Sequence, residues 1–123
     1  MSESRYPPVS LPETPFAEDI RAYCLDLPDA WEDYPWGDIV YKIGTKMFAS
    51  LGGDDTTNVT VKATPEDAEI LVQAPHIEVA PYVGRYGWVT VAVVDEAALD
   101  QVMALISMSY DLVHRGGSRK RQR

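Results

Sequence analysis

Aromatic and basic side chains gather in the middle of the sequence, and their types point most directly to a chemistry. All three tryptophans and four of the six bases of residues 1–114 fall within this group. Its members are Trp31, Tyr34, Trp36, Tyr41, Lys42, Lys46, Phe48, Lys62, Tyr82, Arg85, Tyr86 and Trp88. Aromatic rings stack on nucleobases and cations hold phosphates, so the group fits a ligand or nucleic-acid surface. The alternative is that the rings are core residues and the lysines are solvated charges on alternate strand positions.

Patterns typical of catalysis or metal binding are absent from the sequence. There is no nucleophile elbow, catalytic triad or phosphate loop. The single cysteine, Cys24, falls on the apolar face of an expected helix without a basic neighbour, which is typical of a core thiol. His76 and His114 have no ligand-spaced partner, and the acidic turn 52–58 lacks the spacing of a calcium loop. We therefore expect no catalytic residue, no cofactor and no metal.

Net charge divides the chain into two parts of opposite sign. The whole sequence carries −8, but residues 115–123 hold five bases and no acid, which leaves six bases against nineteen acids in residues 1–114. The basic tail consists of Arg115, Arg119, Lys120, Arg121 and Arg123. An acidic body repels a phosphate backbone at long range, so nucleic-acid binding requires that its few cations cluster locally. The tail is either a non-specific electrostatic tether or a solvated chain end.

Length and composition are those of one globular domain. The 123 residues are 46% hydrophobic and 24% charged, which excludes wholesale disorder and a disulfide scaffold. The longest apolar run, around residues 88–94, is too short to span a membrane, and the proline-rich start has no signal-peptide core. We expect an extended arm over residues 1–13, a single domain over 14–114 and the basic tail over 115–123, in a cytoplasmic protein without membrane contact.

Periodicity and turn residues predict most of the secondary structure. Thr14 and Pro15 indicate the cap and first residue of a helix that ends before Pro28. The apolar face of that helix consists of Phe16, Ile20, Tyr23, Cys24 and Leu27. Strands are predicted over residues 31–34, 39–43, 46–51, 58–63 and 88–94. Short connections between the early strands imply an antiparallel meander.

Two further helices complete the expected fold. Thr64 is followed by a proline and two acids, which predicts a helix over residues 65–73. The segment 74–87 carries two prolines and two glycines and favours an irregular connection. Asp95 is expected to cap a last helix that ends at residues 116–117, both glycine. These elements predict an α+β fold, in which helices pack on an antiparallel sheet.

The last helix is apolar on two sides. One face carries Leu99, Val102, Met103, Ile106, Tyr110 and Val113, and a second stripe carries Leu105, Met108 and Leu112. Two apolar sides indicate either deep burial or contact with another subunit. A protein-interaction or chaperone-like module, with a protein partner or a second copy of the chain, is therefore the alternative to nucleic-acid binding.

Short motifs along residues 15–114 resemble a known family. They are LPDAWEDYPWG at 27–37, YK at 41–42, KMFA at 46–49, Lys62 with TPE at 64–66, Pro75, APY at 80–82, GWV at 87–89 and SYDLV at 109–113. In order and spacing these segments are similar to the MmcQ/YjbR family of small bacterial proteins. The resemblance implies an α+β fold like that of secretion-chaperone-like domains. It also implies DNA binding through a so-called double-wing arrangement, with no catalytic residue or cofactor.

The leading interpretation is a non-enzymatic DNA-binding domain. Phosphate contacts are assigned to Lys42, Lys46, Lys62 and Arg85, and stacking to Trp36, Tyr82 or Tyr86. This interpretation requires that the four cations converge on one face of an otherwise acidic molecule.

Overall fold

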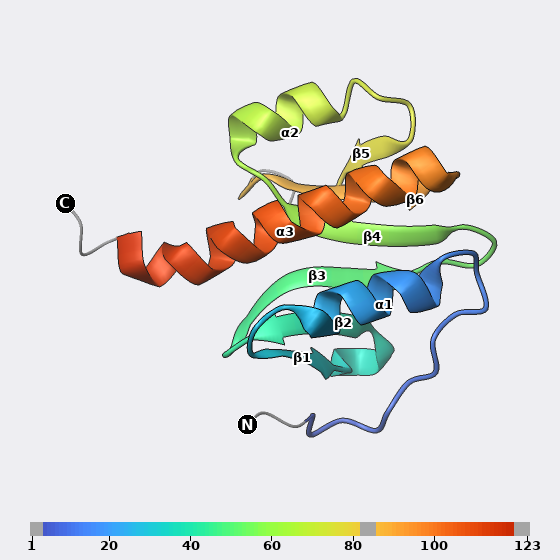
Figure 1. Cartoon of the computed structure of the whole chain (residues 1–123), viewed down its shortest axis with the longest axis vertical. Helices are drawn as coiled ribbons and strands as arrows, with labels where there is room; N and C mark the ends of the chain where they lie inside the picture. Colours follow the sequence, from blue (N-terminus) through green and yellow to red (C-terminus); the bar gives the residue numbers. More distant parts are fainter. Residues whose placement is uncertain (1–3, 82–85, 120–123) are drawn as a thin grey trace.

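One antiparallel sheet and three helices make up the part of the chain that the computed structural model describes, residues 4–81 and 86–119 (Figure 1). The strands are β1 (Ala30–Asp33), β2 (Ile39–Ile43), β3 (Lys46–Gly52), β4 (Thr57–Lys62), β5 (Ile77–Val79) and β6 (Trp88–Val93). Their order in the sheet is β1-β2-β3-β4-β6-β5. The helices are α1 (Ala17–Asp26), α2 (Pro65–Leu71) and α3 (Glu96–Arg119), and a short 3₁₀ turn covers Pro35–Gly37. The predicted α+β class is confirmed.

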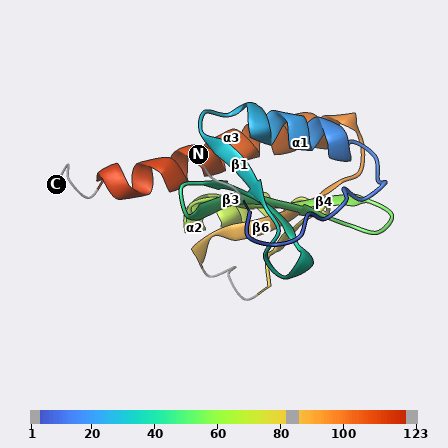
Figure 2. The same ribbon diagram turned by 90° about the horizontal axis from the view of Figure 1, so that it is seen from below.

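Helices α1 and α3 lie across the same face of the sheet, as Figure 2 shows from below. The core forms between them and the strands, because alternate strand residues point toward the helices. Its largest fully buried side chains include Tyr41, Phe48, Ile20 and Ile106. The opposite face of the sheet, called the open face below, carries the residues between these core positions. Among them are Trp31, Asp33, Lys42, Met47, Lys62 and Trp88.

The expected cap of the first helix is wrong. Helix α1 begins at Ala17, and its N-cap is Phe16, in a left-handed conformation without a side-chain cap hydrogen bond. The Thr14 hydroxyl instead hydrogen-bonds the Thr57 hydroxyl at 2.5 Å, and Thr57 donates to the Pro15 carbonyl. Thr57 is fully buried, so its hydroxyl must find partners, and the chain before α1 supplies them.

The other two helix starts are confirmed. Thr64 accepts a hydrogen bond from the Asp67 N–H at 3.1 Å, and Asp95 accepts one from the Ala98 N–H at 2.8 Å. In both cases a short polar side chain satisfies an otherwise orphaned helix N–H.

Two other expectations about chain course are corrected. The segment 74–87 is not wholly irregular, because β5 pairs with β6 along three residues at the edge of the sheet. Helix α3 does not end at residues 116–117 but continues to Arg119. Each glycine costs a helix about 1 kcal/mol relative to alanine, which a helix already held by packing up to Val113 tolerates. Among the described residues, no helix is long and apolar enough to cross a membrane.

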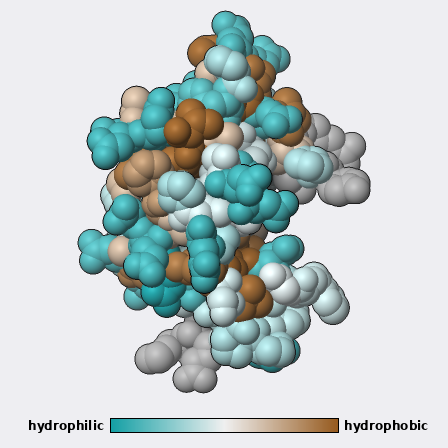
Figure 3. All heavy atoms as spheres, turned by 90° about the vertical axis from the view of Figure 1, so that its right-hand side faces the viewer, coloured by the Kyte–Doolittle hydropathy of each residue, from teal (hydrophilic) through white to brown (hydrophobic). Residues whose placement is uncertain are grey.

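The second apolar stripe on α3 is not a continuous free surface. Leu105 is buried in the core, so its assignment to an interface is wrong. Leu112 is half-buried, and Met108 is 43% exposed. The wide apolar surface of α3 therefore mainly reflects packing against the sheet and α1. At the end of the molecule where α3 begins, Figure 3 shows hydrophobic residues as separate patches among hydrophilic ones.

Candidate nucleic-acid interface

Strands β3 and β4 separate near the C-terminal half of α3 (Figure 1). Their last paired residues at this end are Ala49 and Val61. Beyond this pair, the Ser109 hydroxyl of α3 accepts a hydrogen bond from the Lys62 N–H at 2.9 Å and donates one to the Phe48 carbonyl at 2.6 Å. Ser109 is fully buried. A helix side chain thus replaces a strand-to-strand hydrogen bond and holds the two strands apart.

A pocket of about 340 Å³, called the splay pocket below, lies where the strands separate. It is lined by Lys46, Met47, Lys62, Trp88, Leu112 and Val113. Neither lysine forms an ion pair within the described residues, where the two ion pairs are Arg21–Glu32 and Lys42–Asp33. The pocket therefore combines two uncompensated cations with an aromatic ring and apolar side chains, which suits an aromatic ligand that carries phosphate.

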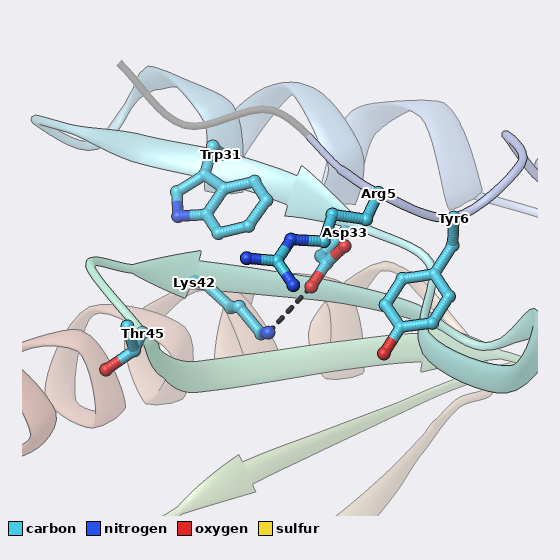
Figure 4. Close-up of a pocket in the computed structure, with 6 residues that line it drawn as sticks. All are labelled: Arg5, Tyr6, Trp31, Asp33, Lys42 and Thr45. Atoms are coloured by element: carbon cyan, nitrogen blue, oxygen red, sulfur yellow. Dashed lines mark hydrogen bonds and ion pairs between the residues drawn. The ribbon is translucent and has the colours of Figure 1, made fainter.

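A second pocket, of about 260 Å³, lies on the open face beside the N-terminal arm (Figure 4). This arm pocket is lined by Arg5, Tyr6, Trp31, Asp33, Lys42 and Thr45. It adjoins the splay pocket across the β2–β3 hairpin, because Thr45 is followed by Lys46 and Lys42 pairs with Met47. The two pockets are therefore neighbours on one end of the molecule.

The arm pocket contains a buried carboxylate. Asp33 is 3% exposed and accepts hydrogen bonds from Lys42 Nζ at 2.6 Å, Ser4 Oγ at 2.6 Å and the Tyr34 N–H at 3.0 Å. Burial alone raises the pKa of Asp33, but these hydrogen bonds outweigh it and hold the pKa below the ordinary value. The charge of Lys42 is thereby balanced within the protein.

Trp31 lies beside the turn of the β2–β3 hairpin and is held there by polar contacts. Its indole Nε1 donates a hydrogen bond to the Gly44 carbonyl at 2.9 Å, and Lys42 Nζ lies 5.4 Å from the ring centroid. Figure 4 shows the guanidinium of Arg5 pointing into the space between Trp31 and Asp33. The ring is thus oriented by polar contacts rather than enclosed in the core.

The structure brings some of the predicted site residues together and separates others. Lys46 and Lys62 share the splay pocket, and Lys42 lies in the adjoining one. Trp36 is 88% exposed but lies just before the start of β2. The splay pocket lies near the end of β2, so Trp36 is separated from it by the length of this strand. Its ring contacts Tyr6 of the arm, with centroids 5.9 Å apart.

The remaining predicted residues fall around the loop before β6 and the end of α3. Tyr86 is 53% exposed and lies two residues before Trp88. Arg115 is exposed on α3, and Arg119 is the last helical residue. The assignments of Tyr82, Arg85, Lys120, Arg121 and Arg123 lie outside the described residues.

On the helix-facing side of β1, Glu32 forms a separate polar cluster. It accepts hydrogen bonds from Tyr41 Oη at 2.8 Å, Tyr34 Oη at 2.6 Å and the Arg21 guanidinium at 3.0 Å. Burial opposes ionisation, but these donors hold the pKa of Glu32 below the ordinary value. Nearby, burial raises the pKa of the Cys24 thiol to about 12, so this thiol stays protonated and unreactive.

Acid is expected to destabilise the fold through Glu32 and Asp33. The pKa values of Glu32 and Asp33 are lower in the folded state than the ordinary values of 4.5 and 3.8. The two carboxylates therefore contribute fully to the free energy of unfolding above those ordinary values, and this contribution is lost as pH falls through the folded pKa values. Urea unfolding between about pH 7 and pH 2 should show a decline that begins near the ordinary values. The Glu32→Gln/Asp33→Asn double variant should show a shallower decline. If stability of the double variant declines as steeply as that of the wild type, Glu32 and Asp33 are not the source of the acid sensitivity. Asp54→Asn/Asp55→Asn, on the exposed β3–β4 turn, is the control.

Ser109, Arg5 and Met47 belong to these sites but were not assigned from the sequence. A serine among the apolar residues of the last helix is a signal that could have indicated Ser109, since a buried hydroxyl needs partners. Met47 could have been found from strand alternation, because it lies next to the core residue Phe48. Arg5 carries no such signal, because nothing local fixes the course of the proline-rich arm.

Two comparisons with solved structures agree with this fold. Protein DR2400 of Deinococcus radiodurans, which contains a DUF419 domain, is 28% identical with a TM-score of 0.73 over 81% of this chain and 79% of that one. A protein from Pseudomonas syringae has the same fold with a TM-score of 0.66 and 22% identity, over 78% of this chain and 97% of that one. No curated protein matches the sequence. The sequence model of the YjbR family matches residues 25–112, from the end of α1 to the splay-pocket part of α3, and the chain therefore belongs to the YjbR family.

Proposed function

We propose that this chain is a non-enzymatic, cytoplasmic DNA-binding protein that contacts phosphates chiefly with Lys46 and Lys62. The observation that carries the proposal is that both side chains line one pocket without an ion-pair partner among the described residues. A phosphate bound there would contact two lysines, and neither would have to break an ion pair with a described carboxylate. The resemblance of the sequence to the MmcQ/YjbR family, which implies DNA binding, supports the same function.

The acidic body sets a limit on this binding. Residues 1–114 carry nineteen acids against six bases, so the long-range field opposes DNA and only local contacts favour it. The acids at the starts of α1 and α3 and in the β3–β4 turn lie at the opposite end of the sheet from the splay pocket (Figure 1). DNA approaching the splay pocket thus avoids these acids. Affinity should be modest, and its salt dependence should report only a few phosphate contacts.

Other predicted cations have different parts in the proposal. Lys42 is already paired with Asp33, so it contributes less than Lys46 or Lys62. Arg115 follows Leu112 by three residues, which places it on the same side of α3 as this pocket-lining residue. Arg85 and the rest of the basic tail are proposed as further phosphate contacts, and Tyr82 and Tyr86 as stacking residues. Trp36, at the other end of β2 from the splay pocket, is not part of the proposed site.

Charge removal at the splay pocket tests the proposal. The Lys46→Gln/Lys62→Gln variant should bind a fluorescein-labelled DNA at low salt roughly tenfold or more weakly than the wild type. The slope of log affinity against log salt concentration should fall by about 2, because two cations no longer neutralise phosphates. Fluorescence anisotropy with duplex and single-stranded DNA measures both quantities.

Two control variants separate local from general effects of charge. Gln73→Glu/Ala97→Glu changes the net charge by the same amount at exposed positions outside the pocket and should bind almost as the wild type does. A variant with glutamine at all five bases of the tail should retain part of the binding. The proposal is overturned if the wild type binds neither form of DNA, if both double variants behave alike, or if the tail variant alone abolishes binding.

A further inference from the structure

Strand pairing places five side chains in two groups on the open face, and the groups adjoin at the splay pocket, which Met47 and Lys62 both line. Trp31 of β1 pairs with Lys42 of β2, and Lys42 pairs with Met47 of β3. On the other side of the splay, Lys62 of β4 pairs with Trp88 of β6. Paired residues share a face of the sheet, so the row runs Trp31, Lys42, Met47, Lys62, Trp88, with a tryptophan at each end and a lysine next to each tryptophan.

The row is accessible and long enough to hold a short polymer. All five side chains are half-buried, so each ring presents part of its surface to solvent. Four steps between neighbouring strands, at about 4.8 Å each, give a length of roughly 19 Å, and the separation of β3 from β4 adds to it. This span suits on the order of four nucleotides, the low end of site sizes for single-strand binding domains.

The composition of the row favours a single strand over a duplex. A duplex hides its base faces and is bound largely through phosphates, which requires many cations. Here one lysine of the row is paired with Asp33, and the body is strongly acidic. A single strand can also bind by stacking its bases on aromatic rings, an interaction that does not require positive charge. Two tryptophans at the ends of the row supply this stacking where phosphate contacts are few.

We propose that the open face binds single-stranded DNA along this row, with bases stacked on Trp31 and Trp88. The intervening phosphates are held by Lys62 of the row and by Lys46, which is outside the row but lines the splay pocket with Met47 and Lys62. The inference rests on the proposed DNA binding and adds the form of DNA and the stacking residues. Arg5 of the N-terminal arm adds a cation at the Trp31 end, as Figure 4 shows.

The three tryptophans allow a matched test. An oligo-dT strand and a mixed-sequence duplex of the same length are titrated against the wild type and the variants Trp31→Leu, Trp88→Leu and Trp36→Leu. Each of the first two variants should bind the single strand roughly tenfold more weakly. Trp36→Leu is the control, because Trp36 is exposed but lies outside the row. Intrinsic fluorescence should fall on addition of oligo-dT, and the fall should persist in Trp36→Leu.

Ring-preserving variants keep the test valid if a leucine variant fails to fold. Trp31→Phe and Trp88→Phe should retain most of the single-strand affinity, because phenylalanine still stacks. The inference is overturned if the duplex binds at least as tightly as oligo-dT, or if the phenylalanine and leucine variants of the row all behave like Trp36→Leu. In those cases DNA binding itself still stands. If neither DNA form binds to the wild type, the proposed function fails as well.

Discussion

Replacing Asp33 with alanine should lower the free energy of unfolding by about 3 kcal/mol. The side chain of Asp33 is 5% exposed and that of Lys42 only 22%, so the variant leaves an ammonium largely shielded from water without its counter-charge. The same carboxylate accepts the hydrogen bond from Ser4 and thereby fixes the N-terminal arm against β1. Urea unfolding followed by circular dichroism measures the loss.

A double-mutant cycle separates this ion pair from simple truncation. Asp33→Ala/Lys42→Met should recover part of the stability lost in Asp33→Ala, because no unpaired charge remains. Asp38→Ala removes an exposed carboxylate from the start of the neighbouring strand and should change stability by less than about 0.5 kcal/mol. Equal losses in Asp33→Ala and Asp38→Ala contradict the role given to the buried pair.

Local sequence patterns determine much of this fold. Strand β2 occupies the residues predicted for it, because apolar residues there are bounded by clear turn residues. The Thr64 and Asp95 caps were predicted because a cap depends only on groups a few residues away. The predicted Thr14 cap does not form, because its hydroxyl is used by Thr57, which is 43 residues away. Strand β5 was missed since three residues carry too little pattern to outweigh the prolines around them.

The candidate sites were less predictable because they depend on contacts between distant segments. Residue type alone indicated Lys46 and Lys62, but their shared pocket follows from the splay of β3 from β4. Residue type could not distinguish Lys42 from these two lysines. In the structure the charge of Lys42 is neutralised by Asp33, which lies only nine residues before it in the sequence. Register in the sheet decides which side chains meet, and it is set by turns and bulges such as the irregularity between Tyr41 and Lys42.

The hydroxyl of Ser109 should matter for both stability and binding. In Ser109→Ala, the Lys62 N–H and the Phe48 carbonyl lose a buried partner, and each unsatisfied group costs about 1–3 kcal/mol. We therefore expect an overall loss of about 3 kcal/mol in the free energy of unfolding. If β3 and β4 close together to pair these groups, part of the stability returns, but the splay pocket between Lys46 and Lys62 becomes smaller. Urea unfolding and DNA titration of the same variant therefore measure two alternative outcomes of one change.

The two readouts together decide whether Ser109 holds the strands apart. A large loss of stability with normal DNA affinity per folded molecule indicates that the strands stay separated and the backbone groups remain unpaired. A small loss of stability with weakened DNA binding indicates closure of the splay. Ser50→Ala is the matched control, since its half-buried hydroxyl is on β3 but outside this contact. If Ser109→Ala matches Ser50→Ala in both measurements, the splay is determined by the strands themselves rather than by the helix that crosses them.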